Sequence, residues 1–250
     1  MDALFDMNGK NVLVTGGSRG LGRAMALAFA ERGANLIIAS RKIDNCEAVV
    51  SEVESYGGKG LAIACHLGKW NEIEKLVDAA YSEFGRVDVL VNNAGMSPVY
   101  PRLTDVSEEL FDKIVNLNLK GPFRLSALVG ERMQQAGSGS IINISSIAAL
   151  KPSPQAEPYG AAKAGLNALT RSLAFAYGPE VRCNCIIAGP FLTDISNAWD
   201  LPVFEKQAKR NMALGRAGQA EEIVAAALYF AGPGAGFTTG AMLRVDGGSV

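Results

Sequence analysis

Short apolar runs alternate with segments of helical periodicity along almost the whole of this 250-residue chain. Most of these runs are apolar at both alternating positions, which is typical of parallel strands buried on both faces. The segments between them carry apolar residues at helical spacing, for example Leu21, Met25, Ala28 and Phe29. The runs that we expect to be strands are 11–15, 35–39, 61–65, 87–91, 140–144, 182–187 and 242–245.

Repeated strand–helix alternation predicts an α/β fold: a Rossmann-like, doubly wound parallel sheet of about seven strands with helices on both faces. In such sheets ligands bind beyond the carboxyl ends of the strands. No linker, repeat or low-complexity segment divides the chain, so residues 1–250 are predicted to form one domain.

Charge and composition exclude several classes of partner. The formal net charge is −1, so no basic surface attracts nucleic acid or an anionic membrane. No apolar window is long enough to span a bilayer, and the acidic N-terminus does not resemble a secretory signal. The four Cys residues lack zinc-site spacing and are expected to be reduced. We therefore expect a cytoplasmic protein without metal, nucleic acid or membrane partners.

The first predicted strand runs directly into Gly16-Gly17-Ser18-Arg19-Gly20-Leu21-Gly22 and then into a helix. The free N–H groups and the dipole of a helix N-terminus favour an anion at this junction. Gly16 would allow the tight turn, Gly20 the approach of a pyrophosphate, and Gly22 close packing of helix on strand. The spacing G-x-x-x-G-x-G differs from the common G-x-G-x-x-G, so the position of the loop carries more weight than its pattern.

The end of the second strand bears on the choice of nicotinamide cofactor. An acidic residue there would hold the ribose 2′-OH of NAD, but this strand ends in Ser40-Arg41-Lys42. Arg41, together with Arg19 in the glycine loop, could instead bind a 2′-phosphate through charge-assisted hydrogen bonds. The alternative is that Arg41 and Lys42 simply lie in a solvated loop. The pattern favours NADP(H) over NAD(H).

Tyr159 and Lys163 are four positions apart and would lie one turn apart on the same face of a helix. A nearby cation favours the phenolate of a tyrosine, whose unperturbed pKa is about 10. The pair could therefore transfer a proton near neutral pH. Taken alone, such a pair is also common on half-exposed helices.

Several motifs occur in a fixed order and together resemble the short-chain dehydrogenases/reductases, especially 3-oxoacyl-carrier-protein reductases and related carbonyl reductases. The resemblance covers roughly residues 9–248. Ser146 precedes Tyr159 by 13 positions, the spacing usual in that family. The motifs are Thr15–Gly22, Asn92-Asn93-Ala94-Gly95, Asn118-Leu119-Lys120-Gly121, Asn143-Ile144-Ser145-Ser146, the Tyr-x-x-x-Lys pair and Arg244-Val245-Asp246-Gly247-Gly248.

The resemblance implies an oxidoreductase that interconverts a carbonyl and a secondary alcohol by hydride transfer with NADP(H). Tyr159 would be the proton donor in reduction and the base in oxidation. Lys163 would lower the pKa of that phenol and bind the nicotinamide ribose. Ser146 would polarise the substrate oxygen, and Asn118 would anchor a water chain to Lys163.

The resemblance also implies a cofactor site, in which Asn93, Ala94 and Gly95 lie against the adenosine half and Thr193 near the carboxamide. His66 stands where relatives usually carry an Asp that contacts adenine, and it is not expected to be a catalytic base. The residues expected at the cofactor are Gly16, Ser18, Arg19, Gly20, Leu21, Gly22, Ser40, Arg41, His66, Leu67, Asn93, Ala94, Gly95, Tyr159, Lys163, Gly189, Pro190 and Thr193.

One departure from the family pattern lies beside that site. Gly189 and Pro190 are transposed relative to the usual Pro-Gly. Because proline fixes φ and lacks an N–H, the loop over the nicotinamide is expected to follow a different path.

Substrate choice is expected to depend on loops 96–102, 147–158 and 191–214, the last read either as a substrate lid or as an ordinary surface helix. Its basic residues Lys206, Lys209 and Arg210 suit a 3-oxoacyl thioester, whereas its apolar residues suit a hydrophobic ketone or aldehyde. A non-catalytic NADP(H)-binding sensor or scaffold is the alternative to an enzyme.

The family resemblance further implies a homotetramer or homodimer, built through two long helices at 107–133 and 159–177 and through the C-terminal segment. Apolar stripes such as Leu166, Leu169 and Leu173 are compatible with that interface, or could face the subunit's own core.

Overall fold

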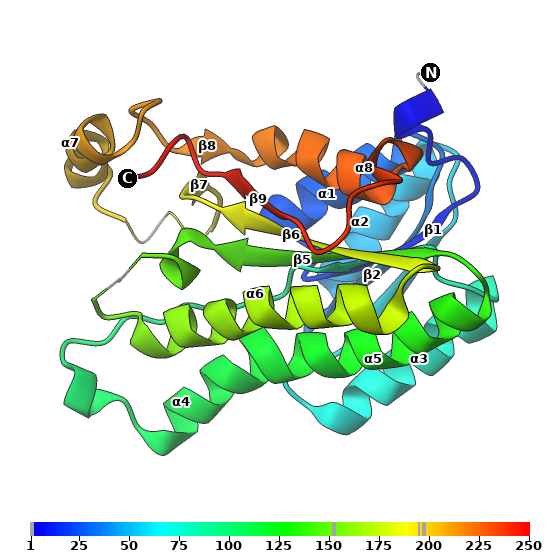
Figure 1. The fold of residues 1–250 in the computed structure, drawn as a ribbon, viewed down its shortest axis with the longest axis horizontal. Coiled ribbons are helices and arrows are strands. Elements are labelled where there is room, and N and C mark those ends of the chain that lie inside the picture. The colour runs from blue at the N-terminus through cyan, green and yellow to red at the C-terminus, as the bar shows by residue number, and fades with distance from the viewer. Residues whose placement is uncertain (1–2, 152–153, 195, 197–198) are drawn as a thin grey trace.

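The computed structural model describes residues 3–151, 154–194, 196 and 199–250, and its central feature is one parallel sheet (Figure 1). Seven strands form this sheet in the order β3-β2-β1-β4-β5-β6-β9. All seven predicted strands are confirmed, and the first and last have the predicted bounds. The strands are β1 Asn11–Thr15, β2 Asn35–Ser40, β3 Gly60–Ala64, β4 Val89–Asn92, β5 Gly139–Ser146, β6 Val181–Ala188 and β9 Met242–Val245.

Helices cover both faces of the sheet, as predicted. Figure 1 shows α1 and α8 on one side and α3, α5 and α6 on the other. Two very short parallel strands, β7 (Phe191–Leu192) and β8 (Gly218–Gln219), form a separate small sheet that the sequence did not indicate. The α-helices are α1 Gly20–Ala30, α2 Ile43–Ser55, α3 Trp70–Phe84, α4 Glu108–Val115, α5 Gly121–Gln135, α6 Glu157–Tyr177, α7 Leu201–Asn211 and α8 Val224–Ala231.

Alternate residues of each central strand enter different hydrophobic cores. In β1, Val12 and Val14 pack with α1, α2 and α8, whereas Leu13 packs with α3, α5 and α6. All three side chains are fully buried. This arrangement is the physical reason that the strands are apolar at both alternations.

The chain reverses its direction across the sheet between β1 and β4, which are neighbours. From β1 it proceeds outward to β2 and β3, and from β4 it proceeds the other way to β5, β6 and β9. Ligands in doubly wound sheets bind at such a switch point. The glycine loop follows β1 and the Asn92–Gly95 turn follows β4, so the topology brings the two motifs together.

The predicted helix at 107–133 is interrupted in the structure. Between α4 and α5, residues Asn116–Lys120 form a π-helical turn, η3. Pro122 cannot donate the next helical hydrogen bond, and the Gly121 N–H reaches back five residues to Asn116 O. A Cβ at Gly121 would overlap Leu67 O, so glycine is required where this turn meets the loop after β3.

Further expectations concern burial and absent features. Leu166 and Leu173 of α6 are buried within the subunit, so that stripe faces its own core. The four Cys residues are buried free thiols.

Among the described residues, no cluster of His, Cys, Asp and Glu could hold a metal ion, and no helix could cross a bilayer. Parts of the predicted loops, residues 152–153, 195 and 197–198, lie outside the described residues, as do residues 1–2.

Candidate active site

Backbone conformation and close packing explain the glycines at three positions of the glycine loop. Gly16 and Gly20 have φ of +63° and +52°, a region that glycine adopts without strain. A Cβ at Gly22 would overlap Gly16 O, so α1 can approach β1 only with glycine there. The N-cap residue of α1, Arg19, makes no side-chain cap, so the N–H groups of the first turn remain for an external anion. These residues fit the pyrophosphate of a dinucleotide.

The turn after β4 holds the glycine loop in place. The Asn93 side-chain amide donates to Thr15 O at 3.0 Å and to Gly16 O at 3.2 Å. The hydroxyl of Thr15 accepts from the backbone N–H groups of Asn93 and Ala94. The amide nitrogen of Asn93 is therefore used on the glycine loop, and its expected place beside the adenosine half remains a prediction.

Two arginines lie free next to this loop. Arg19 and Arg41 are both exposed, and neither guanidinium makes a hydrogen bond or ion pair within the described chain. Ser40, between strand and loop, is occupied locally, since its hydroxyl lies 3.1 Å from Cys46 Sγ. Two unpaired cations beside a phosphate-binding loop suit an additional phosphate group.

His66 has a local structural role. Its Nδ1 accepts a hydrogen bond of 3.2 Å from Gly68 N, and its backbone N–H donates to Glu72 Oε2 at 2.7 Å. These bonds close the turn between β3 and α3. Leu67 is buried in the core and leaves only its backbone toward the loop. The expected place of His66 and Leu67 at the cofactor remains a prediction.

The π-helical turn aims Asn118 at the loop after β4. Asn118 is fully buried, and its amide nitrogen donates to Met96 O and to Ile114 O, each at 2.9 Å. Its Oδ1 accepts from Met96 N at 3.3 Å. A Cβ at Gly95 would lie 2.8 Å from Asn118 Oδ1 and 3.6 Å from Lys163 Nζ, so Gly95 separates two of the predicted catalytic residues.

Ser146 and Tyr159 meet at the carboxyl end of β5. The Ser146 side chain lies close enough to the Tyr159 phenol to lower the pKa of that phenol. Ser146 Oγ also accepts from Ala148 N in the short helix η4 (Ile147–Ala149). A Cβ at Gly160 would lie 2.8 Å from Ala148 O, so glycine beside the tyrosine lets α6 approach η4. The predicted pair is therefore assembled by tertiary packing of α6 on the end of β5.

Lys163 is 3% exposed, and its Nζ donates to Ile144 O at 2.8 Å. Burial lowers the pKa of Lys163 to about 8. Nζ lies 5.8 Å from the centre of the Tyr159 ring. Burial raises the pKa of Tyr159, and the nearby Ser146 side chain offsets only part of that rise. The expected lowering of the phenol pKa by Lys163 remains a prediction.

The transposed Gly189-Pro190 pair has a steric explanation. Gly189 N donates to Val245 O and so extends the β6–β9 ladder, and a Cβ at this position would lie 2.5 Å from Asp246 Cα. A proline at position 189 would lose that hydrogen bond and collide with Asp246. At position 190 only the backbone carbonyl is used in a hydrogen bond, which it accepts from Gly218 N, so proline is tolerated there. Thr193 follows and lies beside Gly20, because a Cβ there would be 3.4 Å from the Thr193 side chain.

Sequence reasoning missed a buried polar network below these residues. The Asn92 amide donates to Ser126 Oγ and Asn143 Oδ1, and the Asn143 amide donates to Thr170 Oγ1 at 2.9 Å. All four side chains are at most 2% exposed. The network joins β4 and β5 to α5 and α6. The only sequence signal for this network is that Asn92 and Asn143 belong to motifs. Their partners Ser126 and Thr170 lie far away in the sequence and carry no such signal.

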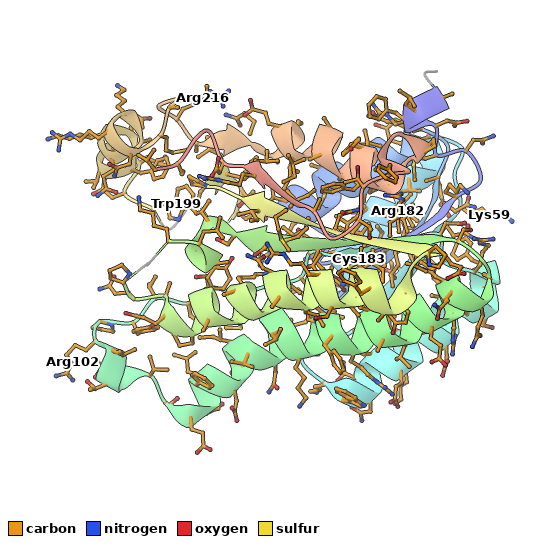
Figure 2. The ribbon with its side chains drawn as sticks, viewed as in Figure 1. Lys59, Arg102, Arg182, Cys183, Trp199 and Arg216 are labelled. Carbon is orange, nitrogen blue, oxygen red and sulfur yellow. The ribbon has the colours of Figure 1, made fainter. Side chains whose placement is uncertain are left out.

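The three loops expected to bind substrate border the same end of the sheet. Figure 2 shows Arg102, Trp199 and Arg216 at the end opposite Lys59. The rings of Trp199 and Phe204 stack with centroids 4.9 Å apart. Only Ala208 of α7 is fully buried, so this helix packs loosely over its neighbours.

The fold and these contacts define the class of protein. The chain has a doubly wound parallel sheet, and at its switch point a glycine loop leads into helix α1, whose N-terminus has no side-chain cap. This is a Rossmann-like dinucleotide-binding fold.

Comparison with known proteins identifies the family. A family model described as enoyl-(acyl carrier protein) reductase matches residues 16–249. L-rhamnose 1-dehydrogenase (NAD(P)(+)) of Azotobacter vinelandii is 39% identical over 247 residues, which cover 96% of this chain and 96% of that protein. Dehydrogenase/reductase SDR family member 4 of Homo sapiens is 34% identical over 242 residues, covering 96% of this chain and 87% of that protein.

A solved structure of 7α-hydroxysteroid dehydrogenase, complexed with NADH and 7-oxo glycochenodeoxycholic acid, is similar with a TM-score of 0.95 and 33% identity. The match covers 100% of this chain and 98% of that chain. The chain belongs to the short-chain dehydrogenase/reductase family. It is accordingly an oxidoreductase of the kind that interconverts alcohol and carbonyl groups with a nicotinamide cofactor.

Proposed function

We propose that this protein is an NADP(H)-dependent enzyme that interconverts a carbonyl and a secondary alcohol, with Tyr159 as general acid and base. The observation that carries the proposal is the closeness of the Ser146 side chain to the Tyr159 phenol, which is enough to lower the pKa of the phenol. Lys163 and Asn118 flank Gly95 close by, at the same end of the sheet. A sensor or scaffold would have no need of such a proton-transfer arrangement.

In this mechanism the bound nicotinamide supplies or accepts the hydride. The Tyr159 hydroxyl gives its proton to the substrate oxygen during reduction, while Ser146 Oγ hydrogen-bonds the same oxygen. The raised pKa of Tyr159 keeps the phenol protonated at neutral pH, as a proton donor requires. With a pKa of about 8, Lys163 is mostly charged at pH 7 and favours negative charge nearby.

The preference for NADP(H) rests on the two free arginines, Arg19 and Arg41. We expect Arg41→Ala to weaken NADPH binding about tenfold to a hundredfold, the range for losing a hydrogen bond to a charged group. NADH binding should change little, because NADH has no 2′-phosphate. Dissociation constants for both cofactors, measured by fluorescence titration, check this prediction.

The matched control removes the same charge elsewhere. Lys59 is exposed at the opposite end of the molecule (Figure 2), so Lys59→Ala should leave both cofactors unaffected. Equal losses of NADPH and NADH binding in Arg41→Ala would remove Arg41 from phosphate recognition.

We propose a 3-oxoacyl thioester or a hydrophobic ketone as the substrate class. Leu201 and Val203 on α7 are about half exposed, at 45% and 50%, and border the expected substrate loops. Lys206, Lys209 and Arg210 on the same helix form no ion pair within the described chain, so they remain available to an acidic carrier or a coenzyme A thioester. Either substrate would use α7 as a lid.

Absorbance of NADPH during incubation with acyl-thioester, ketone, aldehyde and sugar carbonyls tests the proposed function, with NADH in parallel. Oxidation of NADPH by one class confirms the enzyme and names its substrate. Tight NADPH binding without turnover of any carbonyl would instead favour the sensor or scaffold.

We further propose one domain that assembles as a homotetramer or homodimer in the cytoplasm. Phe111 on α4, Phe123 on α5 and Phe175 on α6 are exposed by 48%, 44% and 91%, which is costly for an isolated subunit. The molar mass in solution, measured by light scattering, tests the assembly; a monomer would contradict it.

A further inference from the structure

Tyr100 lies in the loop that follows β4, yet only 5% of its surface is exposed. Its hydroxyl reaches Glu157, the first residue of α6 and 57 positions away in the sequence. The hydroxyl donates to Glu157 Oε2 and accepts a hydrogen bond of 2.9 Å from Glu157 N. Both hydrogen-bonding functions of the phenol are therefore used on one residue.

These contacts replace a helix cap that α6 lacks. Its N-cap residue, Ala156, has no side chain to accept a hydrogen bond, and Pro158 has no N–H. The first N–H groups of a helix have no intrahelical acceptor, so Tyr100 supplies one from another part of the chain. The Glu157 carboxylate also lies at the positive end of the helix dipole. The Tyr100 hydroxyl and nearby backbone N–H groups lower the pKa of Glu157, which keeps it ionised.

The entry into α6 needs such support because its backbone is strained. Gln155, two residues before the helix, has φ of +66°, the only non-glycine residue in the described chain with a positive φ. Such conformations cost free energy and persist only where surrounding contacts impose them. Glu157 and Tyr100 provide contacts immediately after the strained residue.

The same loop is tied to the candidate active site at its other end. Asn118 accepts from Met96 N and donates to Met96 O. Residues 96–100 therefore connect Asn118 to the start of α6, and Tyr159 is the third residue of that helix. A shift of the first turn of α6 would move the Tyr159 hydroxyl relative to Ser146.

We propose that Tyr100 and Glu157 are positioning residues, which fix the first turn of α6 and thereby hold the Tyr159 hydroxyl against Ser146. They act through α6, and they couple the loop 96–102 to the proton donor. This inference rests on the proposed function, because it takes Tyr159 to be the group that transfers the proton.

Tyr100→Phe tests the proposal, since it removes the hydroxyl and keeps the buried ring. We expect kcat to fall about tenfold to a hundredfold, because small displacements of reacting groups carry penalties of that order. KM should change much less than kcat, because the displaced group acts mainly in the transition state. The solvent deuterium isotope effect on kcat should increase, because transfer of the proton becomes slower.

Tyr177→Phe is the matched control. Tyr177 ends the same helix, and its hydroxyl donates a single hydrogen bond of 3.2 Å to Ala127 O. Loss of this hydroxyl should lower the melting temperature about as much as Tyr100→Phe does. It should not change kcat or the isotope effect. If Tyr177→Phe lowers kcat as much as Tyr100→Phe does, both changes act through general stability and the proposal is wrong.

Two further measurements separate this proposal from the proposed function. Amide hydrogen exchange over residues 157–163 should be faster in Tyr100→Phe and unchanged in Tyr177→Phe, whether or not a substrate is known. Adding Glu157→Gln to Tyr100→Phe should not reduce kcat further, since the Glu157 carboxylate has already lost the Tyr100 hydroxyl. Unchanged exchange, or additive losses of kcat, would overturn the positioning role. Faster exchange in Tyr100→Phe, together with no carbonyl turnover by the wild-type protein, would instead contradict the proposed function.

Discussion

Tyr159→Phe should reduce turnover by about 10³-fold while leaving NADPH affinity nearly unchanged. The substitution removes the hydroxyl that lies next to Ser146 and keeps the ring. General acid catalysis contributes about 10²–10⁴ in rate, and the neighbouring Ser146 cannot donate a proton as readily as a phenol. Steady-state turnover on the best carbonyl, together with an NADPH titration, measures both quantities.

Tyr229→Phe is a suitable control for that experiment. The Tyr229 hydroxyl lies 2.8 Å from Thr238 Oγ1 in the C-terminal part of the chain, away from the candidate active site. Its removal should leave turnover intact. Wild-type turnover in Tyr159→Phe would contradict the assignment of Tyr159, whatever the substrate.

Lys163→Met should abolish activity and stabilise the protein at neutral pH. Burial lowers the pKa of Lys163 from 10.5 to about 8, so the folded state at pH 7 contains a costly buried ammonium group. One pKa unit corresponds to about 1.4 kcal/mol, so the variant should gain up to roughly 3 kcal/mol in the free energy of unfolding. The lost hydrogen bond to Ile144 O offsets about 1 kcal/mol of that gain.

The pH dependence of this stability difference follows from the direction of the shift. Between pH 8 and 10.5 the unfolded chain still binds the lysine proton, whereas the folded chain has released it. Wild-type stability therefore rises with pH relative to Lys163→Met, and the advantage of the variant should disappear near pH 10.5. Urea unfolding of both proteins at pH 7, 8.5 and 10 measures it. A difference that stays constant over this range would show that Lys163 is not desolvated in the folded protein.

Local signals in the sequence were sufficient for most of the fold. The strands are apolar at both alternations because each central strand serves two cores, as Val12 and Leu13 show on neighbouring positions of β1. The glycine loop could be predicted for a similar reason, because a Cβ at Gly22 has no room where α1 meets β1. Such requirements appear in the sequence as apolar residues and glycines at fixed spacing.

Contacts between distant segments decided the rest of the candidate site. The use of the Asn93 amide on the glycine loop and the contact between Tyr100 and Glu157 have no local signature, because each joins residues more than 50 positions apart. The π-helical turn at Asn118 depends on packing of Gly121 against Leu67, which a helical pattern cannot show.

The sequence by itself determined the parallel sheet and the glycine loop, because periodicity and glycine spacing are set over a few neighbouring positions. Its motifs indicated the candidate catalytic residues through their resemblance to a known family. Only the tertiary structure decided their electrostatics. The sequence indicated only that Lys163 would favour the Tyr159 phenolate; in the folded chain desolvation raises the pKa of Tyr159 and lowers that of Lys163. Desolvation depends on everything packed around a group, and that arrangement exists only in the folded chain.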